Sequence, residues 1–304
     1  MAKTRVLVSL LTDGQEFQRL QAADATEAAA QHGFEVEIAF AENNGVIQIQ
    51  QLFKAIHARP EDRPRVIIVE TVTGEGLERV ARNAVKSGVG WILLNRRVPY
   101  LAELAHHSSG VPVSSVGTDQ LEVGRIQGRQ FRALLPRGGN VLCIQGPPDT
   151  SAAQERLAGM RTAIEGTHIT VALACGLWTE ESGEQAVTSF LRLKTWQSAP
   201  PDVVGCQNDS MAVGALRVLR SAKEPGFARV PVTGCDGLPD GGRRLVDTKQ
   251  LAATVVTRSN TGPAIELLAR HLKTGRPMPA EVLLPATSYP DEAQLAPVAS
   301  SRLS

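Results

Sequence analysis

The segment VVGCQNDSMAVGAL, residues 203–216, joins an apolar run to a helix rich in small residues through the polar pair Asn208-Asp209. Its first half is typical of a buried strand, so its ending in an amide and a carboxylate needs an explanation. A second segment, VPVTGCDGLPDG (residues 230–241), has the same design, because a β-branched run ends at Asp236. Two buried strands that end in polar side chains indicate a binding edge of a sheet.

Short apolar runs alternate with longer helical segments along the whole chain. The predicted strands cover residues 5–11, 36–41, 65–70, 91–96 and 113–118 in a first set, and 140–146, 170–176, 202–208, 230–236 and 252–257 in a second. Helical segments are expected at residues 17–32, 76–87, 152–164 and 210–222. Near-continuous apolar strands separated by helices indicate βαβ units and parallel sheets covered on both faces. We therefore predict an α/β protein of two doubly wound parallel-sheet lobes with five strands each.

Composition and motifs exclude several classes of protein. The net charge of +1, from 32 Lys and Arg against 31 Asp and Glu, lacks the basic footprint of a nucleic-acid binder, so no nucleic acid is expected as a partner. The segment TGEGLER (residues 73–79) lacks the third glycine of a dinucleotide fingerprint, and the sequence has no P-loop, G-x-S-x-G or H-E-x-x-H motif. Four cysteines without C-x-x-C spacing are expected to be buried, so we expect no metal and no cofactor.

The start of the chain, MAKTRVLVSLLTDG, lacks the apolar core and the small-residue cleavage site of a signal peptide. We expect a protein that either stays in the cytoplasm or has had a leader removed. No run of about 18 apolar residues occurs that could span a membrane.

Polar and aromatic residues collect where the predicted strands end, which is where open α/β sheets bind ligands. Carboxylates, amides and guanidinium groups suit a neutral polyol, because each hydroxyl donates one hydrogen bond and accepts others. An aromatic ring can pack on the apolar C–H face of a sugar, and two lobes could close over such a ligand by a hinge. The candidate ligand-binding residues at these ends are Asp13, Gln15, Phe17, Glu70, Asn95, Arg96, Asp119, Arg156, Trp178, Asn208 and Asp236.

Several candidates have a purely structural alternative. Asp236 could be a turn residue, which is a common use of Asp before glycine. Arg156 could be a surface charge on a helix, and Trp178 or Phe17 could belong to the core. Asp119 could be a hinge or helix-capping residue.

Two candidates compete with their neighbours in the sequence. Asp209 and Ser210 are the better capping candidates for the following helix, which leaves the Asn208 amide for a ligand. In the pair Arg96-Arg97, the position at the strand end favours Arg96 as the inward-pointing side chain.

Four segments resemble one known family: TSAAQERLAGM (150–160), CQNDSMAVGAL (206–216), VTGCDGLPDG (232–241) and LAATVVT (251–257). Together they resemble the ribose-binding-protein branch of the type I periplasmic solute-binding proteins, whose fold the ligand-binding domains of the lactose-repressor family share. The similarity covers residues 5–284. It implies three chain crossings, near Asp119, Thr257 and Pro285, between an N-terminal lobe (1–118 plus 258–285) and a C-terminal lobe (119–257 plus 286–304), with the ligand cleft between them.

The resemblance also implies roles for residues that match the family's motifs. Two residues depart from the family's pattern: Glu70 stands where an Asn often sits, and Thr257 replaces a Gln that is common at the chain crossing near it. The ligand contacts that the resemblance implies are Arg96, Arg156, Asn208 and Asp236, with Trp178 and Phe17 as aromatic contacts.

The expected function is that of a solute-binding protein, not an enzyme, that captures a monosaccharide or polyol for an ABC transporter by hinge closure. The resemblance implies a periplasmic or cell-envelope protein with a transporter permease as its partner, and we expect a monomer. The alternative is a ligand-sensing protein of a signalling system, with a sensor partner. A repressor is disfavoured because the first strand begins at Arg5, and a glycoside-acting enzyme, although carboxylates are present, is the most distant alternative.

Overall fold

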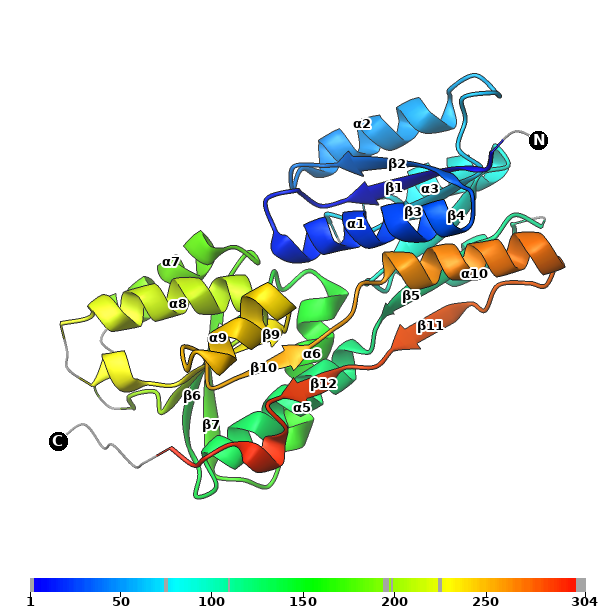
Figure 1. Ribbon diagram of the computed structural model, residues 1–304. Coiled ribbons are helices and arrows are strands. Elements are labelled where there is room, and N and C mark those ends of the chain that lie inside the picture. Colours follow the sequence, from blue (N-terminus) through cyan, green and yellow to red (C-terminus); the bar gives the residue numbers. More distant parts are fainter. Residues whose placement is uncertain are drawn as a thin grey trace. The chain divides into compact units, whose positions relative to one another are not determined.

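The computed structural model describes residues 3–73, 76–108, 110–193, 197, 199–223 and 226–298 (Figure 1). The chain forms two compact units, called here the first lobe (Met1–Thr118 with Ser259–Leu284) and the second lobe (Asp119–Arg258 with Pro285–Ser304). The chain therefore changes lobe three times, after residues 118, 258 and 284. The division expected from the sequence differs in assigning residues 258 and 285 to the first lobe, and its residues 299–304 lie outside the described part.

A six-stranded parallel sheet forms the middle of the first lobe, in the order β11-β5-β4-β3-β1-β2. Its central strands β3 and β4 are buried along their whole length, as their apolar sequences VIIV and GWILL require. The strands are β1 (Arg5–Leu10), β2 (Glu35–Phe40), β3 (Val66–Val69), β4 (Gly90–Leu94), β5 (Val113–Thr118) and β11 (Glu281–Leu284).

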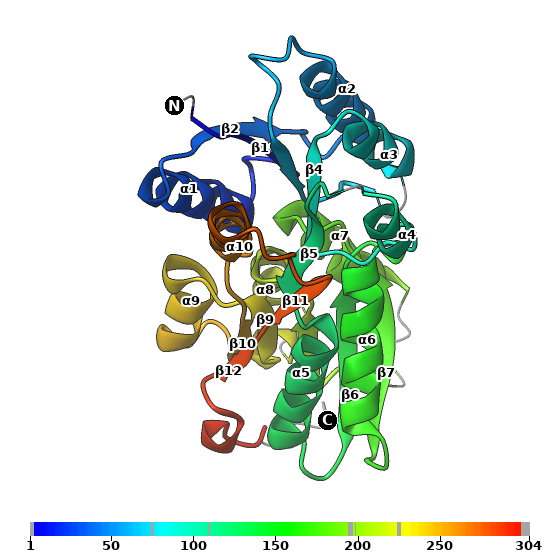
Figure 2. The same ribbon diagram turned by 90° about the vertical axis from the view of Figure 1, so that its right-hand side faces the viewer.

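Helices cover both faces of this sheet (Figure 2). They are α1 (Glu16–Gln31), α2 (Gly45–Ile56), α3 (Glu78–Lys86), α4 (Leu101–His106) and α10 (Thr261–Thr274). Alternation along β1 assigns the faces: Val6 and Val8 pack with α1 and α10, whereas Leu7 packs with α2, α3 and α4.

The second lobe repeats the plan with the order β12-β10-β9-β8-β6-β7. All of its strand pairs are parallel except β12, which runs antiparallel to β10. The strands are β6 (Gly139–Gln145), β7 (Ile169–Cys175), β8 (Val203–Cys206), β9 (Val232–Asp236), β10 (Ala253–Val256) and β12 (Thr287–Tyr289).

Two pairs of helices cover the second sheet, α5 with α6 on one face and α7 with α8 on the other. Short helical turns complete this lobe at Phe227–Arg229, Pro239–Arg243 and Glu292–Gln294. The helices are α5 (Gln120–Leu134), α6 (Ser151–Ile164), α7 (Glu180–Arg192), α8 (Asp209–Ser221) and α9 (Arg244–Asp247).

The helices α5 and α6 pack unusually closely because glycines stand at their contact. A Cβ on Gly124 would lie 2.0 Å from the carbonyl oxygen of Arg156, and one on Gly159 would lie 2.0 Å from that of Leu121. Only glycine therefore fits at either position. The contact at Gly124 fixes the position of the Arg156 backbone relative to α5.

The predicted fold class is confirmed, and all ten predicted strands are present with ends within two residues. The expectation of two five-stranded parallel sheets was wrong in two respects. Each sheet gains a sixth strand from the C-terminal part of the chain, β11 or β12, and β12 is antiparallel. Both strands are short, and β11 alternates between exposed and half-buried residues, so neither has the continuous apolar sequence of the other strands.

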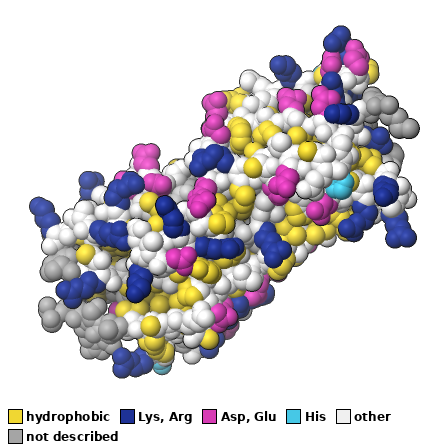
Figure 3. Space-filling model, viewed as in Figure 1, with side chains coloured by type: hydrophobic (Ala, Val, Ile, Leu, Met, Phe, Trp, Pro, Cys, Tyr) yellow, Lys and Arg dark blue, Asp and Glu magenta, His cyan; other side chains and the backbone are white. Residues whose placement is uncertain are grey.

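Over the described residues, no helix combines the length and the apolar character needed to cross a lipid bilayer. On the face shown in Figure 3, Lys and Arg side chains are dispersed among Asp and Glu rather than gathered into one patch. This pattern agrees with the balanced charge of the sequence.

Candidate ligand-binding site

The loop after β1 carries three of the predicted residues on the first lobe. Asp13 is exposed, and its backbone carbonyl accepts a hydrogen bond from Nη1 of Arg19 at 2.6 Å. Gln15 occupies the N-cap position of α1 without capping through its side chain. Phe17 is half-buried in the first turn of α1, and the packed cores of the described residues do not include it. An aromatic ring that is outside the core is available for contact with a ligand.

Glu70 is a buried carboxylate that directly follows β3, and hydrogen-bond donors surround it. Its Oε2 accepts from Nε2 of Gln18 at 3.0 Å and from Nε2 of Gln21 at 2.7 Å. Its Oε1 accepts from Nδ2 of Asn95 at 3.4 Å and lies 3.6 Å from Nη2 of Arg96. The Glu70 side chain is only 2% exposed. Glu70 therefore connects the end of β4 to α1 and holds the Arg96 side chain in place.

Asn95 and Arg96 follow β4 in a constrained backbone. Asn95 has a φ of 52°, in the left-handed region that few residues other than glycine adopt. Gly117 allows β5 to approach this turn, because a Cβ there would lie 3.1 Å from the Asn95 Cα. Arg96 is buried and donates from Nη1 to the Asn95 carbonyl at 3.2 Å, whereas Arg97 is exposed and paired with Glu281. Arg96 is thus the inward residue of the pair, as expected.

Arg156 and Trp178 form the clearest cluster at the strand ends of the second lobe. The guanidinium carbon of Arg156 lies over the Trp178 ring, 5.5 Å from its centre. The Arg156 side chain also donates from Nε to Oε1 of Gln120 at 2.7 Å and from Nη1 to the carbonyl of Gln207. Arg156 is 5% exposed, so it is not a surface charge, and Trp178 is half-buried at the edge of the α7–α8 core.

The capping assignment at the start of α8 was wrong. Asn208, not Asp209 or Ser210, is the N-cap, and its Oδ1 accepts from the Met211 backbone N–H at 2.9 Å. Its Nδ2 donates to the carbonyl of Trp178 at 2.9 Å. Asn208 has the extended backbone that an N-cap requires, whereas Asp209 is already helical. An amide has two N–H groups and two lone pairs on oxygen, so one of each remains for a ligand.

Asp236 ends β9 with a φ of 115°, well inside the range that favours glycine. Its backbone carbonyl accepts from the N–H of Thr257 at 3.0 Å and faces the Thr257 hydroxyl at 3.5 Å. Thr257 is buried, so it supports the Asp236 turn, and Asp236 itself is half-buried. Of the six non-glycine residues with positive φ among the described residues, Asn95, Trp178 and Asp236 are predicted ligand contacts. Such strained residues cluster at functional sites.

Asp119 stands at the first change of lobe and caps α5. Its side chain accepts a hydrogen bond from the Glu122 backbone N–H at 3.0 Å. The capping alternative expected for this residue therefore applies.

Sequence reasoning missed the polar residues that hold the candidate residues in place. On the first lobe, Gln18 and Gln21 hold Glu70, and Gln48 bridges Ser9 and the Glu70 carbonyl from α2. On the second lobe, Gln207 and Asp209 bind the loops around them. Glutamines inside helices give no sequence signal that separates a buried partner from a solvated residue.

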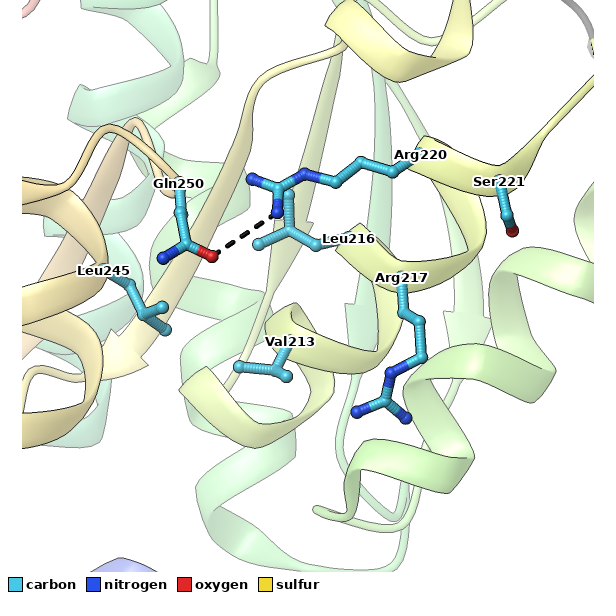
Figure 4. Close-up of a pocket in the computed structure, with 7 residues that line it drawn as sticks. All are labelled: Val213, Leu216, Arg217, Arg220, Ser221, Leu245 and Gln250. Atoms are coloured by element: carbon cyan, nitrogen blue, oxygen red, sulfur yellow. Dashed lines mark hydrogen bonds between the residues drawn. The ribbon is translucent and has the colours of Figure 1, made fainter.

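Two pockets lie away from most of these residues. A cavity of about 410 Å³ on the second lobe is bounded by α8 and the region around α9, and its lining residues are Val213, Leu216, Arg217, Arg220, Ser221, Leu245 and Gln250 (Figure 4). It includes no predicted site residue. A cavity of about 260 Å³ on the first lobe is lined by residues around α4 and does include Arg96.

Other chemistry has little support in the described residues. These residues contain no group of three or more His, Cys, Asp or Glu side chains that could hold a metal ion. Burial raises the pKa of the Cys143 and Cys235 thiols to about 12 and the pKa of Cys206 well above its usual value, while Cys175 is exposed. Three of the four cysteines are therefore protonated core residues. The expectation that Cys175 is buried as well was wrong, because it ends β7, an edge strand with mostly exposed or half-buried residues.

Comparison with known proteins shows which fold and family the chain shares. Over 193 residues the chain is 29% identical to the ribose import binding protein of Escherichia coli (strain K12), covering 63% of this chain and 59% of that protein. A myo-inositol binding protein from Caulobacter, solved with myo-inositol, superposes with a TM-score of 0.79 at 24% identity, covering 94% of this chain and 93% of that one. The fructose-binding periplasmic domain of a hybrid two-component system superposes with a TM-score of 0.79 at 22% identity, covering 93% and 89%.

The match to the ribose protein spans less than two thirds of that protein's length, and the two structural similarities establish the fold alone. The family model described as a periplasmic binding protein domain, in contrast, matches residues 6–276, which is most of the chain. The chain belongs to the periplasmic binding protein domain family.

Proposed function

We propose that this protein binds a small neutral polyhydroxylated solute, a monosaccharide or a polyol, and delivers it to an ABC transporter. The observation that carries the proposal is the cation–π contact between the Arg156 guanidinium and the Trp178 ring at the carboxyl edge of the second sheet. An arginine offers several N–H donors to ring oxygens and hydroxyls, and an indole offers an apolar face to sugar C–H groups. Proteins of this family that resemble the chain are named for ribose and myo-inositol.

Charge supports a neutral ligand over an anionic one. The positive charge of Arg96 is balanced by the buried carboxylate of Glu70, so the first lobe's strand ends do not offer an uncompensated cation. A phosphate or carboxylate group needs such a cation to offset the cost of losing its hydration. A phosphate or carboxylate group that faces the first lobe should therefore bind poorly.

The proposal assigns direct ligand contacts to Phe17, Asn95 and Arg96 on the first lobe, and to Arg156, Trp178, Asn208 and Asp236 on the second. We propose that one ligand molecule contacts both groups. Binding would then draw the lobes together around the points where the chain changes lobe, which is a hinge closure.

In this proposal, three of the candidate residues support their neighbours and do not contact the ligand. Glu70 holds Arg96 and Asn95, Thr257 holds the Asp236 turn, and Asp119 caps α5. The loop residues Asp13 and Gln15 stay as candidate contacts beside Phe17.

A thermal-shift screen tests the proposal directly. The panel comprises D-ribose, L-arabinose, D-fructose, D-allose and myo-inositol, with ribose 5-phosphate and glucuronate as anionic comparisons. A ligand at 100 times its Kd adds about 2.7 kcal/mol of stability, which gives a clear rise in Tm. We expect a rise with at least one neutral compound and none with the anions. A rise with anions alone would contradict the proposal.

A sensor is the second candidate, favoured by the similarity to the fructose-binding domain of a two-component system. Both functions use the same capture of a solute, and they differ in the partner. Reconstitution with a membrane permease and its ATPase separates them: stimulation of ATP hydrolysis by the liganded protein supports transport. We also propose a periplasmic location, a monomer in solution and no chemical change of the ligand. Recovery of intact sugar after prolonged incubation tests the last of these.

A further inference from the structure

We infer that the junction between β8 and α8, residues Gln207-Asn208-Asp209, is a positioning hub that fixes the ligand-contacting loops of the second lobe, with Asp209 as its key positioning residue. The inference rests on the proposed function for what these loops bind. Each of the three side chains reaches a different part of the lobe, and together they touch the loops that follow β6, β7 and β9.

Gln207 forms hydrogen bonds with the loop after β6 and with α6, the helix that carries Arg156. Its Oε1 accepts from the Gly146 N–H at 3.0 Å, and its Nε2 donates to the Ala153 carbonyl at 3.2 Å. Its own carbonyl accepts from Nη1 of Arg156. Gln207 is 1% exposed, so these contacts replace water entirely.

Asn208 forms a hydrogen bond with the loop after β7. Its Nδ2 donates to the carbonyl of Trp178, whose φ of 65° places the backbone in the left-handed region. The same side chain caps α8 through Met211. One amide thereby couples the orientation of the aromatic residue to the start of a helix.

Asp209 forms a hydrogen bond with the loop after β9. Its Oδ2 accepts from the Gly237 N–H at 2.7 Å, and its Oδ1 accepts from the Thr254 hydroxyl at 2.8 Å. The carboxylate also occupies the space beside two glycines, because a Cβ on Gly234 or Gly242 would lie about 2 Å from its oxygens, at 2.0 and 2.1 Å. A side chain at either glycine would displace the carboxylate.

The strained backbone explains why such a hub is needed. Trp178 and Asp236 have φ values of 65° and 115°, and conformations of this kind persist only where surrounding contacts hold them. Gly237, which Asp209 binds, directly follows Asp236. Asp209 therefore acts on the ligand through the Asp236 turn, without contacting the ligand.

The test compares Asp209→Ala with Asp202→Ala, because an asparagine at position 209 could still accept from the Gly237 N–H and donate to the Thr254 hydroxyl. Asp202 lies just before β8, at the other end of the same strand, where its Oδ2 accepts from the Asn140 N–H at 2.8 Å. Both substitutions replace a carboxylate that accepts a backbone hydrogen bond, but only Asp209 touches a ligand-contacting loop. Titration calorimetry with D-ribose, D-fructose and myo-inositol gives the affinity, and amide hydrogen exchange of Gly237 gives the order of the loop without any ligand.

We expect Asp209→Ala to weaken binding of the tightest of these three compounds at least tenfold and to speed exchange at Gly237 at least tenfold. Asp202→Ala should keep the affinity within twofold. Wild-type affinity and exchange in Asp209→Ala would overturn the inference, and so would an equal loss of affinity in Asp202→Ala, since that loss would be a general effect of destabilisation.

Two further arms keep the result decisive. If Asp209→Ala does not fold, Gly242→Ala displaces the same carboxylate without removing it and should give the same pattern, whereas wild-type behaviour would overturn the inference. If the wild-type protein binds none of the three compounds, the proposed function fails, and the exchange of Gly237 alone decides the role of Asp209.

Discussion

The guanidinium carbon of Arg156 lies 5.5 Å from the centre of the Trp178 ring, and both residues stand at the carboxyl edge of the second sheet. Each of the two is held by a bond to the β8–α8 junction, Arg156 through the Gln207 carbonyl and Trp178 through the Asn208 amide. The stack is therefore organised by the protein itself. A preorganised stack lowers the ordering cost that a ligand has to offset.

Replacing the indole tests the role of this stack. Trp178→Leu removes both the cation–π contact with Arg156 and the flat apolar surface for a sugar ring. A cation–π contact contributes about 0.5–2 kcal/mol, so affinity for the best-bound neutral sugar should fall about tenfold. Titration calorimetry measures the loss. Leu177→Ala is the control, because Leu177 is the adjacent residue and is 65% exposed. Equal affinities in the two variants would remove Trp178 from the site.

Glu70→Gln should destabilise the fold and weaken binding without changing ligand preference. Side-chain donors of Gln18, Gln21, Asn95 and Arg96 surround the Glu70 carboxylate, so a glutamine places its own N–H₂ against a donor in either orientation. Breaking a buried ion pair costs about 3–5 kcal/mol, which urea unfolding measures. The exposed Glu103, paired with Arg82, gives the control Glu103→Gln, which should leave stability unchanged.

Ligand titration of the same variant shows whether Glu70 supports its neighbours or contacts the ligand directly. Calorimetry of Glu70→Gln with a neutral sugar and its matched amino sugar should show equal losses, because Glu70 acts through Arg96 and Asn95. A loss confined to the amino sugar would mean that Glu70 touches the ligand directly.

The thiols predict a simple labelling pattern. Burial disfavours the thiolate and raises the pKa of Cys143 and Cys235 to about 12, so at pH 8 roughly one molecule in ten thousand carries either thiolate. The exposed Cys175 should react alone with a thiol reagent such as Ellman's reagent, giving one equivalent in the native protein and four in urea. Native Cys175→Ser should give none, and rapid labelling of that variant would show that a buried cysteine is accessible.

The central strands could be predicted because burial on both faces produces continuous apolar runs, as in residues 66–69 and 90–94. The edge strands β11 and β12 could not, because they are short, only partly buried and defined by partners far away in the sequence. Glu281 pairs with Ser115 and Tyr289 with Thr254. No local pattern encodes such long-range pairing.

The candidate site could be predicted to the level of polar side chains at strand ends, since the change from apolar to polar at Asp236 or Asn208 is visible in the sequence. Which of those side chains caps the helix and which makes other contacts could not be predicted. Asn208, Asp209 and Ser210 are all good capping residues, and only the backbone of the folded junction decides that Asn208 caps. Similarly, the partners that hold Glu70 come from α1, about 50 residues earlier in the chain, as the separations of 52 and 49 residues show.

The most direct test of the central proposal, one neutral ligand contacted by both lobes, is titration calorimetry of three arginine variants with the best-bound sugar of the thermal-shift panel. Arg96→Ala removes a group of the first lobe and Arg156→Ala a group of the second, while Arg97→Ala removes the exposed neighbour that pairs with Glu281. The account predicts one site per chain, affinity at least a hundredfold weaker in both Arg96→Ala and Arg156→Ala, at about 1.4 kcal/mol per tenfold, and unchanged affinity in Arg97→Ala. Wild-type affinity in either Arg96→Ala or Arg156→Ala would contradict it.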